Sequence, residues 1–326
     1  MLRLIRLFVL TFFATLRKRW ARGPARPSWS FSFEATVGYL RRDWEETATW
    51  DLVRLREEMG SRPYPQPLSK RVTTKDDPLG GVPARWFIPE GAADDVAVLF
   101  FHGGSYIYGS ARTTHADLIT RIALAAGLTT IGIDYRLAPE HPYPAQLDDA
   151  LAAYEALLAR GVKRVLFAGD SAGGNLAIEA QLALRDRGAA QAAAAALISP
   201  WSDLTMPGRS FVDNDAFDFG RREELALHAK AYAGEVALDD PRLSPTYAKL
   251  EGLRPIYIHA GEAEIPRDDI LLLADRLEAA GVEVTRHVAP DMPHNAPMFA
   301  AYHPAAQASL EAVGAFLRRQ GEREAR

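Results

Sequence analysis

The sequence lacks three features, and each absence excludes a class of protein or site. None of its 326 residues is cysteine, which excludes disulfides, cysteine-ligated metals and thiol nucleophiles. The apolar stretch at 7–16 is interrupted by Thr11 and Thr15 and is too short for a membrane span, which needs about twenty residues. A basic excess is also missing, because the net charge is −4, whereas nucleic-acid-binding domains are usually basic. We therefore expect no nucleic-acid partner.

Positive charge is nevertheless concentrated at the N-terminus. Residues 1–22 contain six Arg or Lys residues and no acidic residue, which leaves a net charge of −10 for the rest of the chain. We predict a basic, apolar helix there, and no small-x-small cleavage site of a signal peptide follows it. Two placements fit: residues 1–20 lie on a membrane surface, or the apolar face packs on the protein's own domain. Because the lack of cysteine suits a reducing compartment, we expect a cytoplasmic protein, membrane-associated under the first placement.

The next part of the chain, up to residue 69, is expected to hold a linker and a helical stretch. Gly23, Pro24 and Pro27, with several Ser and Arg, make residues 20–35 typical of a linker. Apolar residues at roughly helical spacing predict helix within 36–60. Three prolines between 63 and 67 are expected to end it.

From residue 70 onward, short apolar runs alternate with helical stretches. Several runs are almost continuously apolar, as in parallel strands covered on both faces, and the alternation predicts a doubly wound, mostly parallel α/β sheet. Strands are expected at 84–88, 96–101, 129–133, 164–168, 194–198, 255–259 and 283–288, and helices at 112–126, 145–160, 173–188, 267–280 and 304–319. Residues 205–235 break this rhythm, so we interpret them as an insertion.

A G-x-S-x-G motif, Gly169 to Gly173, follows one of these strands and precedes a helix. This is the context of a nucleophile elbow, where a tight turn leaves room only for glycine on either side of the serine. The alternative is a glycine-rich turn with an incidental serine. The motif alone is weak evidence, but its strand–turn–helix context makes Ser171 the predicted nucleophile.

A second glycine-rich motif, HGGS at 102–105, directly follows the strand at 96–101. Attack of a serine on a carbonyl creates an oxyanion, which needs backbone N–H donors already directed at it. We expect the N–H groups of Gly103, Gly104 and Ala172 to form this oxyanion hole. His102 is expected to anchor the loop rather than to transfer protons.

The predicted general base is His294, one of eight histidines. It lies in a loop after the last predicted strand, and such sheets build their sites at the carboxyl ends of the strands. The rival is His303, whose position beside Pro304 is typical of a helix start. We expect His259 and His287 to lie within strands, and His115 and His228 to lie on helix surfaces.

The acid of the triad should follow the strand at 255–259. Glu264 is favoured because it lies in the loop itself, and Glu262 is the next choice. Asp268 and Asp269 are placed to serve the positive end of the following helix. With a Ser…acid…His order, these residues predict a triad of Ser171, Glu264 and His294.

The sequence at this point resembles a known family, the hormone-sensitive-lipase-like esterases, also called α/β-hydrolase fold-3 proteins. The resemblance covers roughly residues 70–320 and depends on a combination of segments rather than on any single one. These are HGGS, DYRLAPEHPYPA (134–145), GDSAGGNLA (169–177), SPWSDLT (199–205) and DPRLSP (240–245).

The resemblance implies an α/β-hydrolase fold with a helical cap and no cofactor or metal. The cap would be built from residues 23–69 and the insertion at 205–235, over a catalytic domain at 70–322. Two departures stand out: Ser105 replaces the third glycine of the usual HGGG, and Glu264 stands where the family usually has Asp. Asp170, Asp203 and Asn175 match family positions, and we interpret them as structural supports.

The function expected from residues and resemblance together is a serine carboxylesterase acting on short-to-medium acyl esters. Its partner would be a small-molecule ester, with the oligomeric state left open, a dimer included. A lactone hydrolase or an acyltransferase would use the same triad. A non-catalytic small-molecule receptor is disfavoured because both Ser171 and His294 are present.

Overall fold

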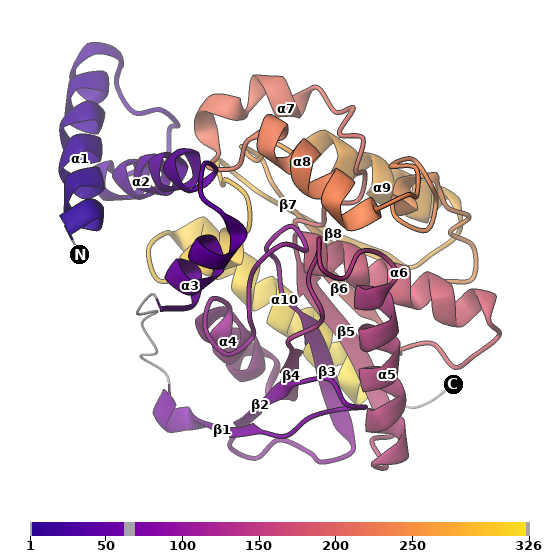
Figure 1. Cartoon of the computed structure of the whole chain (residues 1–326). Coiled ribbons are helices and arrows are strands. Elements are labelled where there is room, and N and C mark those ends of the chain that lie inside the picture. The colour runs from indigo at the N-terminus through magenta and orange to yellow at the C-terminus, as the bar shows by residue number, and fades with distance from the viewer. Residues whose placement is uncertain (1, 62–68, 324–326) are drawn as a thin grey trace.

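The core of the molecule is one eight-stranded sheet, seen in a computed structural model that describes residues 2–61 and 69–323 (Figure 1). The strand order is β1-β2-β4-β3-β5-β6-β7-β8, and every neighbouring pair from β4 to β8 is parallel. The strands are β1 (Val72–Asp76), β2 (Ala84–Pro89), β3 (Val96–Phe101), β4 (Thr129–Ile133), β5 (Arg164–Asp170), β6 (Ala195–Ile198), β7 (Ile256–Gly261) and β8 (Val284–Ala289). The expected α/β-hydrolase fold is confirmed.

All seven predicted strands are present, and β1 was missed. Its burial explains the omission, because only Val72 is buried and the other four residues are exposed. An edge strand of this kind, paired antiparallel with β2 alone, carries neither an apolar run nor alternation for the sequence to reveal.

Helices cover both faces of the sheet. Side chains alternate along β3, so that Leu99 and Phe101 join one apolar core while Val98 and Phe100 join the other. The first core is closed by α5 (Ala145–Ala159), α6 (Ala172–Asp186) and α9 (Arg267–Ala279), and the second by α4 (Ala116–Ala126) and α10 (Pro304–Glu322). This two-sided coverage is why the central strands read as nearly continuous apolar runs.

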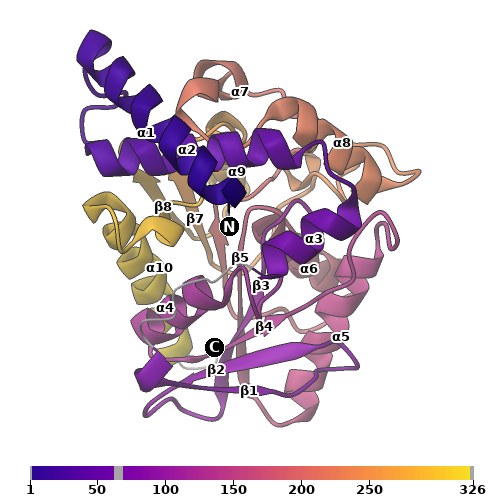
Figure 2. The same cartoon turned by 60° about the vertical axis from the view of Figure 1, so that its left-hand side comes forward.

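The remaining helices gather at one end of the sheet (Figures 1 and 2). They are α1 (Leu2–Arg22), α2 (Phe31–Thr47), α3 (Leu52–Ser61), α7 (Ser210–Asp213) and α8 (Arg222–Ala233). Between 36 and 60 there are thus two helices rather than one. The expected linker ends early, because Ser30 caps α2 through the N–H of Phe33. The three prolines between 63 and 67 lie outside the described residues.

Helix α1 forms as predicted. It packs on α2, but most of its apolar side chains point away from the protein. Its buried residues are Leu7, Thr11 and Thr15, whereas most of its large apolar side chains are exposed. The placement in which the apolar face packs on the protein's own domain is therefore wrong. Among the described residues, no helix is both long and apolar enough to cross a membrane.

Candidate active site

Ser171 lies at a sharp turn between β5 and α6. Its backbone has φ 54° and ψ −119°. Residues other than glycine rarely adopt this conformation, which needs support from the surrounding structure. A Cβ atom at Gly169 or Gly173 would collide with a neighbouring backbone carbonyl. The carbonyl of Ile198 accepts the N–H of Ser171 at 2.9 Å. The turn therefore has the shape of a nucleophile elbow.

Two loops at the same edge of the sheet bring Glu264 and His294 together. Glu264 follows β7, His294 follows β8, and the distance from Glu264 Oε2 to His294 Nδ1 is 2.6 Å. The other carboxylate oxygen accepts the N–H of Gly261 at 2.6 Å and the hydroxyl of Ser199 at 3.2 Å. Glu264 is completely buried, so its side chain is fixed in position by these three contacts.

The other carboxylates considered for this position are occupied elsewhere. Glu262 accepts the backbone N–H of Asp291. Asp268 accepts the N–H of Ser210 and pairs with Arg267. Asp269 is buried, and burial raises its pKa to about 7. Each of these residues serves the start of α9 or a neighbouring loop, whereas Glu264 contacts the imidazole of His294.

Burial and pairing act in opposite directions on the pKa of both partners. Burial disfavours the charged imidazole of His294, but the hydrogen bond and negative charge of Glu264, followed by the charges of Asp218 and Asp170, raise its pKa above the ordinary value. Burial raises the pKa of Glu264, although the contact with His294 counteracts the shift. The arrangement favours an imidazole that readily accepts a proton.

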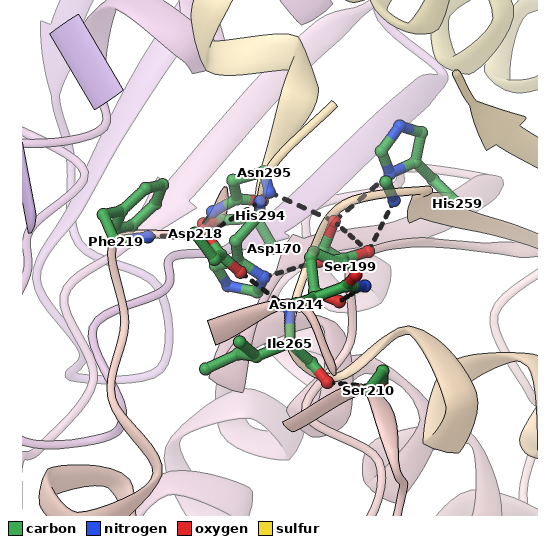
Figure 3. Close-up of polar contacts among 12 residues, drawn as sticks. Asp170, Ser199, Ser210, Asn214, Asp218, Phe219, His259, Ile265, His294 and Asn295 are labelled. Atoms are coloured by element: carbon green, nitrogen blue, oxygen red, sulfur yellow. Dashed lines mark hydrogen bonds and ion pairs between the residues drawn. The ribbon is translucent and has the colours of Figure 1, made fainter. Parts of the chain in front are cut away.

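Asp218, from the segment between α7 and α8, is a neighbour of His294 that no sequence motif indicated. Its completely buried carboxylate accepts three backbone N–H groups, those of Phe219 (2.8 Å), Ile265 (2.8 Å) and His294 (3.1 Å). Figure 3 shows it beside His294 and Asn295. Burial raises its pKa, opposed by the charge of His294 and by these donors. Asp218 thereby connects the loop that follows β7 to the loop that follows β8.

Ser199 is a second residue whose place the sequence did not reveal, although it lies within the SPWSDLT segment. Its hydroxyl contacts Glu264 and, at 3.2 Å, both His259 Nδ1 and the N–H of Asn295 (Figure 3). His259 lies in β7, as predicted, and burial lowers its pKa to about 3. Ser199 thus links the loop of Glu264 to the loop of His294 and Asn295.

The HGGS loop corrects one of the expected oxyanion donors. The N–H of Gly103 is already bound to Asp170 Oδ1 at 3.0 Å, because the loop is held against the end of β5. Gly103 is therefore not available as a donor. In the described parts of the chain, the N–H groups of Gly104, Ser105 and Ala172 have no acceptor, and Gly104 and Ser105 line the same cavity as Ser171.

Asp170 connects several loops beneath the site. Besides Gly103, its carboxylate contacts His115 Nε2 at 3.2 Å and accepts the side-chain amide of Asn295. The expectation of a surface position for His115 is wrong. His115 is buried at the start of α4, where its imidazole contacts this carboxylate. Although burial works against ionisation, the charge of His115 lowers the pKa of Asp170. Asp170 is thus the support that we expected.

The remaining histidines have structural environments. His102 donates from Nδ1 to the Gly103 carbonyl at 2.7 Å and stacks on Tyr135, and burial lowers its pKa to about 4. His303 accepts the N–H of Ala305 and so caps α10. His228 is largely buried rather than on a surface, and burial lowers its pKa to about 4. His287 lies in β8, as predicted.

Behind the elbow lies a buried polar cluster of Asn175, Glu179, Tyr106 and Tyr232. Glu179 accepts hydrogen bonds from the Asn175 amide (2.8 Å) and from the Tyr232 hydroxyl (2.9 Å). The Asn175 amide also reaches Tyr106 in the HGGS loop region and the carbonyl of Leu243. Burial raises the pKa of Glu179 to about 8. The cluster joins α6, the residue that follows the HGGS loop, and α8.

Ser171 and His294 open into one cavity of about 620 Å³. Its walls are mainly apolar and come from both the N-terminal helices and the segment after β6. They include Leu4, Leu40, Trp44, Met59, Leu118, Trp201, Phe219, Leu225, Met298 and Phe299. In the described part of the chain, no group of three or more His, Asp or Glu side chains could hold a metal ion.

Comparison with known proteins identifies relatives of this chain. A family profile described as alpha/beta hydrolase fold matches residues 98–298. An acetyl-hydrolase of Streptomyces hygroscopicus is 38% identical over 246 residues, covering 74% of this chain and 81% of the relative. An esterase of Acinetobacter venetianus is 34% identical over 67% of this chain and 73% of its own.

Solved structures extend the likeness over most of the chain. A hormone-sensitive lipase from a metagenome library has a TM-score of 0.82 at 34% identity and covers 87% of this chain and 97% of its own. An esterase from the bacterial hormone-sensitive lipase family has a TM-score of 0.76 at 36% identity and covers 98% of both chains. The chain therefore belongs to the α/β-hydrolase family, in its hormone-sensitive-lipase-like group of carboxylic ester hydrolases.

Proposed function

We propose that this protein is a serine carboxylesterase in which Ser171, His294 and Glu264 form the catalytic triad. The observation that carries the proposal is the 2.6 Å contact between Glu264 and His294, beside a strained Ser171 that lines the same cavity. Because Nδ1 of His294 is bound to Glu264, Nε2 is the nitrogen left to receive a proton from the serine.

The mechanism follows from these positions. As the Ser171 hydroxyl attacks the ester carbonyl, His294 takes its proton, and Glu264 stabilises the imidazolium that forms. The N–H groups of Gly104, Ser105 and Ala172 bind the oxyanion of the tetrahedral intermediate. His294 then protonates the departing alcohol, which leaves an acyl-enzyme. Water, activated by His294, hydrolyses that intermediate and regenerates Ser171.

Short-to-medium acyl esters are the substrates that we propose. A cavity of about 620 Å³ falls within the range of small-molecule sites, roughly 300–1,000 Å³. Its apolar walls suit an acyl chain, and the acetyl-hydrolase relative points toward short acyl groups. The helices at the carboxyl end of the sheet, assigned to a cap at 23–69 and 205–235, would limit the length of chain that fits.

The proposal is tested with p-nitrophenyl esters from acetate to palmitate, alongside a panel of lactones and an acyl-acceptor assay. We expect the highest kcat/KM for acetate to octanoate. Rates that keep rising up to emulsified long-chain esters would contradict the substrate assignment. Faster turnover of lactones, or acyl transfer in preference to hydrolysis, would assign the same triad to a lactone hydrolase or an acyltransferase.

A further inference from the structure

Helix α1 is attached to the protein by its polar side. Arg19 pairs with Glu34 of α2 at 2.8 Å, and Arg3 pairs with Asp43 and Glu46 of the same helix. The buried residues of the helix are Thr11, Thr15 and the single apolar side chain Leu7. These ion pairs lie near both ends of α1, so they fix which face of the helix turns toward α2 and which face turns away from it.

The outer face of α1 is apolar. Nine of its large hydrophobic side chains are exposed, and Trp20, Phe13 and Phe8 have 90%, 63% and 60% of their surface accessible. The others are Leu2, Ile5, Val9, Leu10, Phe12 and Leu16. An apolar face of this extent on a helix held in place by ion pairs is unusual for a protein surface in water and indicates a binding surface.

The charges beside this face distinguish between partners. Arg17, Lys18 and Arg22 are exposed, and within the described residues none of them has an acidic partner. Residues 1–22 carry no acidic side chain, whereas the rest of the chain has a net charge of −10. Although Arg3, Arg6 and Arg19 are paired with acids of α2, pairing with a second copy through α1 would still bring the three unpaired cations of each copy together. A surface that is both apolar and anionic complements them.

We propose that the outer face of α1 binds the surface of a membrane containing anionic lipids. Phe8, Phe13 and Trp20 enter the boundary between headgroups and acyl chains, where aromatic side chains are favoured. Arg17 and Lys18 contact the acidic headgroups. The helix lies in the plane of that surface, and its ion pairs to α2 hold the catalytic body against it.

This placement also brings the catalytic cavity close to the lipid. Leu4, one turn before Phe8 on α1, lines the cavity that contains Ser171. If the proposed esterase function holds, esters dissolved in the membrane reach the cavity along α1 without crossing bulk water. Docking should then accelerate hydrolysis of a vesicle-embedded ester and leave hydrolysis of a water-soluble ester unchanged.

The test is flotation of the full chain with vesicles made of equal parts phosphatidylcholine and phosphatidylglycerol, compared with vesicles of phosphatidylcholine alone. We expect binding to the anionic vesicles, weakened by added salt. Phe13→Ser with Trp20→Ser should weaken this binding by about a hundredfold or more, because two large side chains lose their burial. Arg17→Gln with Lys18→Gln should weaken it by about thirtyfold.

The matched control is Val53→Ser with Val212→Ser, two apolar side chains of similar exposure, 67% and 68%, on α3 and α7. It should bind vesicles like the wild type. Hydrolysis of p-nitrophenyl butyrate should be equal in the wild type and the three double variants. If the wild type does not hydrolyse this ester, the esterase function is contradicted rather than the docking.

The docking proposal is wrong if the wild type does not bind anionic vesicles, or if the Phe13/Trp20 variant still binds them. A wild-type dimer that this variant converts to monomer, without vesicle binding, would instead make α1 an interface between copies.

Discussion

The carboxylate of Asp218 accepts the backbone N–H of His294 at 3.1 Å, although 76 residues separate them in the sequence. Asp218 comes from the segment inserted after β6, and its own carbonyl accepts a hydrogen bond from Arg41 of α2 at 3.1 Å. The proposed base is therefore positioned by both parts of the chain that lie over the carboxyl end of the sheet. A movement of either segment would therefore displace His294.

Replacing Asp218 by Asn should change the pH dependence of catalysis. The negative charge of Asp218 contributes to the raised pKa of His294, and kcat/KM requires the neutral imidazole. Removing the charge lowers that pKa, so the acid limb of the kcat/KM profile should shift to lower pH. The new amide would also face the N–H of Ile265, costing about 1–3 kcal/mol of unfolding free energy. A loss of stability with an unmoved acid limb would show that Asp218 has only a structural role.

The acid is tested by Glu264→Gln, with Glu262→Gln as its matched control. The amide keeps the shape of the side chain but loses the charge that stabilises the imidazolium. We expect kcat to fall on the order of 10⁴-fold, as for the corresponding change in a serine protease. In the described structure the carboxylate of Glu262 accepts a single hydrogen bond, from the N–H of Asp291 in the neighbouring loop, so its variant should stay within a few-fold of wild type. Equal losses in the two variants would refute the assignment of Glu264.

His294→Ala and His303→Ala should separate activity from stability. The first variant removes the proposed base and should lose several orders of magnitude in kcat while remaining folded. The second removes the cap of α10 and should cost about 1 kcal/mol of unfolding free energy without a comparable loss of kcat. Circular dichroism melting and steady-state kinetics on both proteins check this pair of outcomes.

Glu179→Gln should remove a pH dependence of stability. Burial raises the pKa of Glu179 from its ordinary value of 4.5 to about 8, so the folded protein holds a proton that the unfolded chain releases at lower pH. The unfolded state therefore binds fewer protons in this window, and stability falls as pH rises from 4.5 to about 8. Gln has no proton to release, so denaturant midpoints of the variant should decline less over this range. An unchanged decline would place its origin elsewhere.

Much of this architecture could be predicted because the central strands and the elbow leave local signals. Strands buried on both faces must be apolar along their length, and the turn at Ser171 tolerates only glycine at 169 and 173. Glu264 was favoured by its place in the loop between β7 and α9, and the structure puts it in contact with His294. These features depend on neighbours in the sequence.

The parts that were missed depend on contacts distant in sequence. Gly103 was expected to donate to the oxyanion, but its N–H is bound to Asp170, 67 residues away. His115 and Asp218 contribute through buried contacts with other loops, and nothing adjacent to them in the sequence marks those partners. The orientation of α1 likewise depends on contacts distant in sequence, because its ion pairs with α2 lie on the face that turns inward.

The most direct test of the account is covalent labelling of Ser171. A serine-directed organophosphonate should add once to the wild-type protein, and peptide mapping by mass spectrometry should locate it on Ser171. Ser171→Ala should take up no label and lose on the order of 10⁴–10⁶-fold in kcat. A label on any other residue, or substantial ester hydrolysis by the alanine variant, would contradict the assignment of Ser171 as the nucleophile.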